Sequence, residues 1–186
     1  MRVTKEPEQR KQEILDTAMR LFYEKGYEKT SITDIAKAIG VAQGLCYRYF
    51  PSKESLFDSA IDQYAEELVN AFSIALDSDK LSLKEIIQTM PVMLETEDSK
   101  YYKTLHVAEN KKFHDQLTLK VCEKLSKVVA KLLQNAKEKG EISIDNTEMI
   151  ALFCVYGQIG ILFNKNYTLD EKEKHIRDFL IYALRL

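Results

Sequence analysis

Apolar residues recur at intervals of three and four along most of this 186-residue chain, which is the spacing of one face of an α-helix. No run shows the alternation of apolar and polar residues that is typical of a half-buried β-strand. Only three prolines and six glycines interrupt the helical pattern. The pattern therefore predicts an all-α fold, with a first helix at about residues 8–25.

Two short helical segments follow, near residues 32–39 and 43–49. Ser31, with Asp34 three residues later, is a capping signal that satisfies backbone donors and places negative charge at a helix start. Gly40 separates the two segments, and glycine tolerates the positive φ that a sharp helix end requires. Two short helices joined by such a turn predict a helix-turn-helix, whose second helix enters the major groove of DNA.

Helical periodicity continues through the rest of the chain. Ser52 is a predicted N-cap for a long helix, Pro91 is expected to kink or shorten the helix after it, and Asp145 or Asn146 is expected to cap the apolar stretch near the end. The predicted helices cover about 53–76, Leu83 to Leu94, shorter pieces in 100–116, then 117–138, Met149 to Phe163, and Leu169 to the end.

The net charge of −2 conceals an asymmetry between the two parts of the chain. Residues 1–53 hold ten Lys or Arg and seven Asp or Glu, whereas residues 54–186 hold 17 and 22, so the balances are +3 and −5. This polarity is expected if only the N-terminal part meets DNA. We expect a DNA-binding domain at 1–52 and a helical body at 53–186.

The three cysteines lie far apart without a Cys-x-x-Cys pair, which argues against a disulfide framework or a zinc knuckle. The three histidines show no metal-ligand spacing. No targeting segment and no run of transmembrane length is apparent. We expect a cytoplasmic protein with no metal, no cofactor and no membrane partner.

Between about residue 10 and residue 60 many positions carry one shared pattern, namely Ile14, Ala18, Phe22, Gly26, Tyr27, Thr30, Ile35, Ala36, Gly40, Val41, Gly44, Tyr47, Tyr49, Phe50, Ser52, Lys53, Glu54 and Leu56. This pattern resembles the TetR (tetracycline-repressor-like) family of transcriptional regulators. Beyond Phe57 only the all-helical character and the length match the family. The resemblance implies an N-terminal three-helix DNA-binding head and a larger helical body for ligand binding and dimerisation.

Four residues of the second short helix are candidates for contact with the bases. Gln43 can bond adenine in two places and Arg48 can do so with guanine, each pair giving about 1–3 kcal/mol of discrimination. Gly44 allows the backbone to approach the duplex, and Leu45 offers apolar contact, for instance to a thymine methyl.

The resemblance also implies a set of residues that hold phosphates and so position the head. The alternative for Lys53 is a solvated surface lysine, and for the two tyrosines it is packing in the small core of the head. The set comprises Thr30, Ser31, Tyr47, Tyr49 and Lys53.

Two body helices carry apolar faces wider than one neighbouring helix needs. Together they predict a four-helix interface with a second copy, which resembles how the family dimerises. The alternative is that both are ordinary core helices of one subunit. The predicted interface residues are Val121, Leu125, Val128, Leu132, Met149, Phe153, Tyr156, Gly157 and Gly160.

The family further implies a small-molecule pocket in the body. Its candidate lining consists of aromatic, sulfur-containing and polar side chains, which suit an amphipathic ligand, and the alternative for each is plain core, the commoner role of such residues. The sequence leaves the charge of the ligand undetermined. The candidates are Tyr64, Phe72, Met90, Met93, Tyr101, Tyr102, His106 and Phe113.

These features predict a repressor that binds a palindromic DNA operator as a homodimer and is released by a small-molecule effector. Two other classes of protein fit the sequence less well. An enzyme is disfavoured because the sequence has no nucleophile elbow, phosphate loop, dinucleotide fingerprint or zinc-protease motif. A purely helical interaction module would not need the aromatic and basic cluster between Tyr47 and Lys53.

Overall fold

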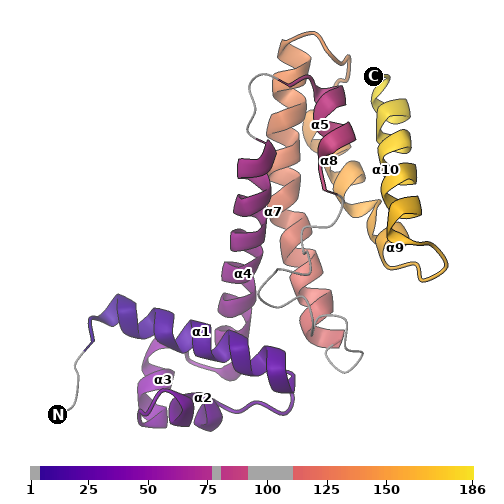
Figure 1. Ribbon diagram of the computed structural model, residues 1–186. Helices are drawn as coiled ribbons and strands as arrows, with labels where there is room; N and C mark the ends of the chain where they lie inside the picture. Colours follow the sequence, from indigo (N-terminus) through magenta and orange to yellow (C-terminus); the bar gives the residue numbers. More distant parts are fainter. Residues whose placement is uncertain (1–4, 77–80, 92–110) are drawn as a thin grey trace. The chain divides into compact units, whose positions relative to one another are not determined.

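The computed structural model describes residues 5–76, 81–91 and 111–186, and within them the chain is all-α, as predicted (Figure 1). No helix in these ranges is long and apolar enough to cross a membrane. The helices are α1 (Pro7–Lys25), α2 (Ile32–Ala38), α3 (Gln43–Tyr49), α4 (Lys53–Leu76), α5 (Leu83–Thr89), α7 (Lys111–Glu138), α8 (Thr147–Tyr156), α9 (Ile159–Leu162) and α10 (Leu169–Leu184).

The chain forms two compact units. Among the described residues the first unit, called the head below, holds 5–65 and 111–120, and the second, called the body, holds 66–76, 81–91 and 121–186. This division cuts through α4, whereas the sequence predicts a boundary after residue 52. The first turns of α4 belong to the head because Leu56 and Phe57 are fully buried there.

Aromatic and aliphatic side chains from several helices form the core of the head. Phe22 of α1 meets Phe57 of α4 edge to face, with ring centroids 5.0 Å apart. Phe113 of α7 lies 6.1 Å from Phe57, and both rings are fully buried. Ile14 and Ile35 complete this core from α1 and α2. The short helix α2 contacts α1 on one side and α3 on the other, so both short helices are tied to this core.

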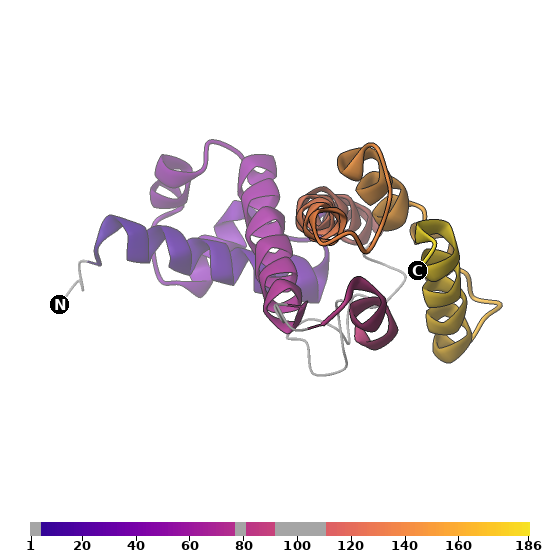
Figure 2. The same ribbon diagram turned by 90° about the horizontal axis from the view of Figure 1, so that it is seen from above.

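In the body, α5, the second half of α7, α8 and α10 surround a common centre (Figure 2). The centre is apolar, and its buried residues include Ile87 of α5, Leu133 of α7, Ala151 of α8 and Leu180 of α10. Each helix presents one buried stripe to the others, which is the arrangement expected for packed amphipathic helices.

Several helix ends agree with the sequence. The backbone N–H of Ser55 donates to the hydroxyl of Ser52 at 3.0 Å, and α4 runs to Leu76 as predicted. Asn146 caps α8 through a 2.9 Å hydrogen bond from the N–H of Met149. These ends were predictable because each cap lies within three residues of its partner.

The helix predicted from Leu83 to Leu94 ends earlier, at Thr89. Met90 has extended backbone angles (φ −63°, ψ 142°) because the ring of Pro91 disfavours helical angles in the preceding residue. Residues 92–94 lie outside the described ranges, as does most of the predicted 100–116 segment. The helix predicted at 117–138 is longer than expected, because α7 begins at Lys111.

The single apolar helix predicted from Met149 to Phe163 is wrong, because the chain breaks there into α8 and α9. The side-chain amide of Gln158 donates to the carbonyl oxygen of Cys154 at 2.5 Å. In a continuous helix that oxygen would accept the backbone N–H of Gln158. Gly157, a weak helix former, occupies the junction, so a side chain replaces one backbone bond of the helix.

Candidate nucleic-acid interface

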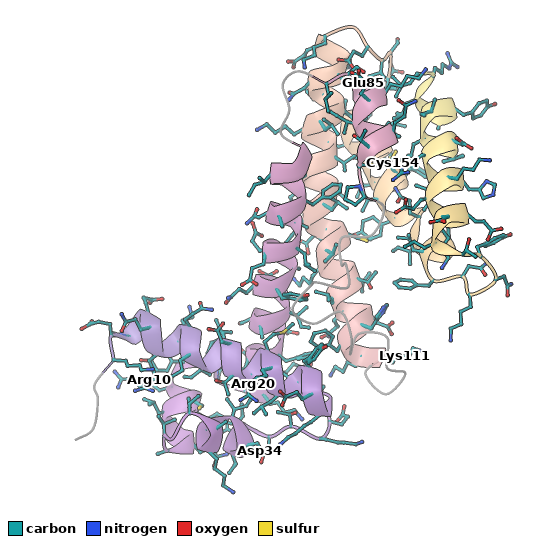
Figure 3. All side chains as sticks on the ribbon, viewed as in Figure 1. Arg10, Arg20, Asp34, Glu85, Lys111 and Cys154 are labelled. Atoms are coloured by element: carbon teal, nitrogen blue, oxygen red, sulfur yellow. The ribbon has the colours of Figure 1, made fainter. Side chains whose placement is uncertain are left out.

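The start of α2 is fixed by the capping box that the sequence predicts. The N–H of Asp34 donates to the Ser31 hydroxyl at 3.1 Å, and the N–H of Ser31 donates to the Asp34 carboxylate at 2.9 Å. Figure 3 labels Asp34 at this helix start. The hydrogen bonds from Ser31 hold the pKa of the Asp34 carboxyl below its usual value. A negative charge is thus kept at the positive end of α2.

The turn between α2 and α3 is built on Gly40. Gly40 has φ 71°, and its N–H donates to the carbonyl of Lys37 at 3.2 Å. The N–H of Val41 donates to the carbonyl of Ala36 at 2.9 Å. This pair of bonds is a Schellman motif, which ends a helix sharply and needs a left-handed residue at the glycine position. The motif directs the chain into α3 within three residues.

One face of α3 is buried and the opposite face is open. Cys46 is fully buried, which anchors the helix in the head. Gln43, Gly44, Tyr47 and Arg48 are all exposed, and their spacing of one and four residues puts them on a single helical face. The predicted base-contacting residues Gln43 and Arg48 therefore lie together with the predicted backbone-approach residue Gly44.

The remaining α3 candidates are less open. Leu45 and Tyr49 are half-buried, so each divides its side chain between the head core and the surface. Ala42 is the N-cap of α3 and makes no side-chain hydrogen bond there. This agrees with the absence of a serine or threonine at that position, and it leaves the first N–H groups of α3 without a side-chain acceptor at the N-cap.

Thr30 has a role that the sequence did not predict. Its side chain is only 1% exposed, and its hydroxyl donates to the carbonyl oxygens of Gly26 (2.8 Å) and Leu21 (3.1 Å). The residue thus closes the end of α1, where backbone acceptors lack partners within the helix. This placement speaks against the phosphate contact predicted for the Thr30 hydroxyl. Ser31, its neighbour, is exposed.

Lys53 is half-buried at the start of α4, with its ammonium over the ring of Tyr27, 4.1 Å from the centroid. It also lies within 3.5 Å of the Glu28 carbonyl oxygen. Lys112 approaches the same ring at 3.8 Å. Tyr27 therefore receives two cations, and a phosphate contact by Lys53 competes with this packing.

The predicted ligand residues do not gather at one place. Tyr64 and Phe113 are buried in the head, whereas Phe72 and Met90 line a cavity in the body. The other candidates, Met93, Tyr101, Tyr102 and His106, lie outside the described residues.

The predicted interface residues divide by helix. On α8, Met149, Phe153 and Tyr156 are exposed, with Phe153 at 73%. Gly157 and Gly160 are exposed as well. Leu125 and Leu132 of α7 line the body cavity. All four α7 candidates are half-buried: Val121, Leu125, Val128 and Leu132.

Sequence reasoning missed the exposed apolar face of α10. Phe179 is 63% exposed and Tyr182 is 82% exposed, and Leu152 adds a further exposed leucine on α8. A signal was present, because the last helix holds more apolar residues than its single buried stripe of Ile176, Leu180 and Leu184 requires.

Comparisons with known proteins agree with the geometry of the head. Residues 14–60 match the model of the bacterial regulatory proteins of the tetR family. The chain is 44% identical over 54 residues to the uncharacterized HTH-type transcriptional regulator YuxN of Bacillus subtilis, a match that covers 29% of this chain and 19% of that relative. The chain thus spans only about a fifth of that relative's length.

Two further matches extend over nearly the whole chain. The chain is 24% identical over 179 residues to IcaR, the HTH-type negative transcriptional regulator of the biofilm operon icaADBC in Staphylococcus aureus, covering 94% of this chain and 96% of IcaR. A solved structure of a Mesorhizobium loti transcriptional regulator assigned to the TetR family superposes with a TM-score of 0.69 at 20% identity. It covers 96% of this chain and 98% of that one. The latter likeness concerns the fold alone.

Proposed function

We propose that the chain is a DNA-binding transcription regulator of the TetR family, and specifically a repressor that binds a palindromic operator as a homodimer and leaves it when a small molecule binds. The observation that carries this proposal is the open face of α3. It presents Gln43, Gly44, Tyr47 and Arg48 opposite the buried Cys46.

In this proposal α3 enters the major groove. Gln43 and Arg48 bond the edges of bases, since an amide and a guanidinium can each make two hydrogen bonds to one base. Gly44 lets the backbone approach the duplex because it has no side chain, and the space beside it is open, since a methyl group there would meet no atom of the chain within 4 Å. Ser31, Tyr47, Tyr49 and Lys53 bind phosphates and hold the register of the head.

The homodimer is supported by the exposed apolar side chains of α8 and α10, called the α8–α10 face below. It consists of Met149, Leu152, Phe153, Tyr156, Phe179 and Tyr182. An isologous interface pairs the same face of two copies and would give a four-helix arrangement. Two copies of α3 then meet two half-sites, which is why the operator is expected to be a palindrome.

IcaR is a negative transcriptional regulator, and its match covers 94% of this chain, which supports repression as the mode of action. Release by a small molecule is supported by the cavity among the helices of the body. In this mechanism the dimer has one form that fits the operator and one form that does not. The ligand releases the operator only if it binds the second form more tightly than the first, with a coupling free energy on the order of 1–3 kcal/mol.

The test begins with selection of bound duplexes from a random pool at fixed salt, followed by titration of the selected duplex. Gln43→Ala and Arg48→Ala should each relax the preference at one base position and cost about 1–3 kcal/mol. Asp58→Ala, an exposed residue on α4, is the matched control and should change neither. Selection of no sequence, or unaltered preference in both variants, would refute the assignment of α3.

A further inference from the structure

A cavity of about 70 Å³ lies within the body. Each described residue of its lining belongs to that one unit. Cys154, on α8, lies among the helices that surround it (Figure 3). The walls come from five helices and include Phe72 of α4, Ile87 of α5, Val129 of α7, Cys154 of α8 and Leu180 of α10.

The described lining is chemically uniform, and no charged side chain of residues 5–76, 81–91 or 111–186 belongs to it. Gln158 and Cys154 carry its polar side-chain groups, and the Gln158 amide already donates to the Cys154 carbonyl at 2.5 Å. Burying an ionised group without a partner of opposite charge is strongly unfavourable. An apolar molecule, in contrast, gains from leaving water for such a site.

Arg177, a described residue of α10, brings a cation close to the cavity. Its guanidinium donates to the carbonyl oxygen of Met90, a lining residue, at 2.8 Å. It also forms an ion pair with Glu173 at 3.1 Å. The Glu173 carboxylate balances the charge of Arg177, which therefore adds no net positive charge for an anionic ligand, while the buried Nε–H of Arg177 has no hydrogen-bond partner among the described residues.

The Cys154 thiol does not change this conclusion. Burial raises the pKa of the thiol, so the neutral form predominates, and a thiol is a far weaker nucleophile and metal ligand than a thiolate. Among the residues that the structure describes, no group of three or more His, Cys, Asp or Glu side chains is placed to hold a metal ion. Noncovalent binding is therefore the mode that suits the site.

The cavity and the α8–α10 face share the same two helices. On α8, Val155 lines the cavity while Phe153 and Tyr156 point to the surface. On α10, Leu180 lines the cavity while Phe179 is exposed. A molecule that moves the inner side of these helices also moves their outer side.

We propose that this cavity binds small, uncharged, apolar molecules, and that the effector of the chain belongs to this chemical class. The second half of this statement rests on the proposed function. The volume is about half of the roughly 150 Å³ at which an apolar cavity accepts benzene. A larger ligand requires a side chain to move, and Met90 is suited to this because methionine has three rotatable bonds.

The experiment uses the full chain and three compounds of similar shape, namely toluene, benzylammonium and benzoate. Toluene at about ten times its Kd should raise the melting temperature by roughly 3–6 °C, because only the folded state binds it. The two charged compounds should leave the melting temperature unchanged. Val129→Phe fills the cavity and should abolish the toluene shift, whereas Val128→Phe, the same change at a neighbour outside the lining, should retain it.

Alkylation of the wild-type protein keeps the proposal testable if Val129→Phe does not fold. Toluene should slow the reaction of Cys154 with iodoacetamide several-fold and leave Cys46, which is buried in the head, unaffected. Absence of any toluene shift, an equal shift with benzoate or benzylammonium, or unchanged alkylation of Cys154 would overturn the proposal.

The selected operator separates this inference from the proposed function. If the chain binds that duplex but not toluene, the cavity proposal alone fails. If toluene binds and no duplex can be selected, the proposed function fails. Release of the operator by charged compounds of a matched series, and not by their neutral counterparts, would overturn the assignment of the effector class.

Discussion

The hydroxyl of Thr30 donates a 2.8 Å hydrogen bond to the carbonyl oxygen of Gly26, which joins the end of α1 to the residue before the α2 cap. Gly26 has φ 83°, so the chain leaves α1 through a conformation that disfavours a side chain. The Thr30 hydroxyl supplies a donor where the helix has run out of backbone donors. The hydrogen bond between Thr30 and Gly26 fixes the position at which α2 begins.

Replacement of Thr30 by valine removes this donor and keeps the shape of the side chain. We expect a loss of about 0.5–1.5 kcal/mol in the free energy of unfolding, measured with urea, because one partner of a buried hydrogen bond is lost. Thr30→Ser keeps the hydroxyl and should retain the bond. DNA affinity per folded molecule should not change in Thr30→Val, and a drop at full folding would restore Thr30 as a phosphate contact.

Lys53 either binds a phosphate or only packs on Tyr27, and two variants separate these roles. Lys53→Gln should weaken binding to every duplex and reduce the salt slope by about 1, because one phosphate contact is lost. Tyr27→Leu removes the ring but keeps the lysine, so it should cost about 0.5–1 kcal/mol of stability from the lost cation–π contact, in addition to any packing loss. Its salt slope should be that of the wild type. An unchanged slope in Lys53→Gln would leave Lys53 with a purely structural role.

The capping boxes make stability depend on acid pH. Hydrogen bonds from Ser82 lower the pKa of the Glu85 carboxyl, and those from Thr168 lower the pKa of the Glu171 carboxyl. A carboxyl with a lowered pKa binds protons less well in the folded state, so its contribution is present at neutral pH. That contribution is lost as the pH falls from about 5 towards 3.

The double variant Glu85→Gln with Glu171→Gln tests this dependence, since glutamine also serves in a capping box but does not titrate. Unfolding free energies measured with urea should show a smaller decline between about pH 5 and pH 3 than in the wild type. The double variant Glu138→Gln with Glu148→Gln, at two exposed glutamates outside the capping boxes, should keep the wild-type decline. Equal declines in all three proteins would contradict the role of the caps.

Gly157 and Gly160 offer a comparison at the break between α8 and α9. A methyl group at Gly157 would lie 2.6 Å from the carbonyl oxygen of Phe153, whereas one at Gly160 would meet nothing within 4 Å. Gly157→Ala should therefore destabilise the fold by about 1–3 kcal/mol through the forced backbone shift. Gly160→Ala should be neutral or stabilise by up to about 1 kcal/mol, because alanine is the better helix former. Urea unfolding at one fixed protein concentration measures both, and equal effects would exclude the clash as the cause.

The features that sequence reasoning identified correctly are local. The Ser31 and Asp34 box, the Gly40 turn and the bounds of α4 each depend on residues a few positions apart, so their chemistry is visible in a short window. The open face of α3 also followed from the placement of the helix-turn-helix.

The features that were missed depend on distant partners or on competing side chains. Glu141 accepts the N–H of Leu83 at 2.5 Å from 58 positions away, which no local pattern indicates. The Gln158 side chain displaces a backbone bond that periodicity assumes to be intact. Periodicity also does not tell a stripe covered by the same chain from one left open, which is why Phe179 and Tyr182 were overlooked.

Phe179 is therefore the residue whose change tests the α8–α10 face most directly. A glutamate at this position would place an unpaired charge in the proposed interface, at a cost of about 3–5 kcal/mol. Phe179→Glu should raise the dimer dissociation constant at least a hundredfold in sedimentation equilibrium and weaken operator binding, because one head reaches only one half-site. Ile74→Glu, at an equally open apolar residue on α4, should leave both unchanged. If Phe179→Glu stays dimeric at micromolar concentration, the α8–α10 face is not where two copies meet, and the operator's symmetry must arise from another surface.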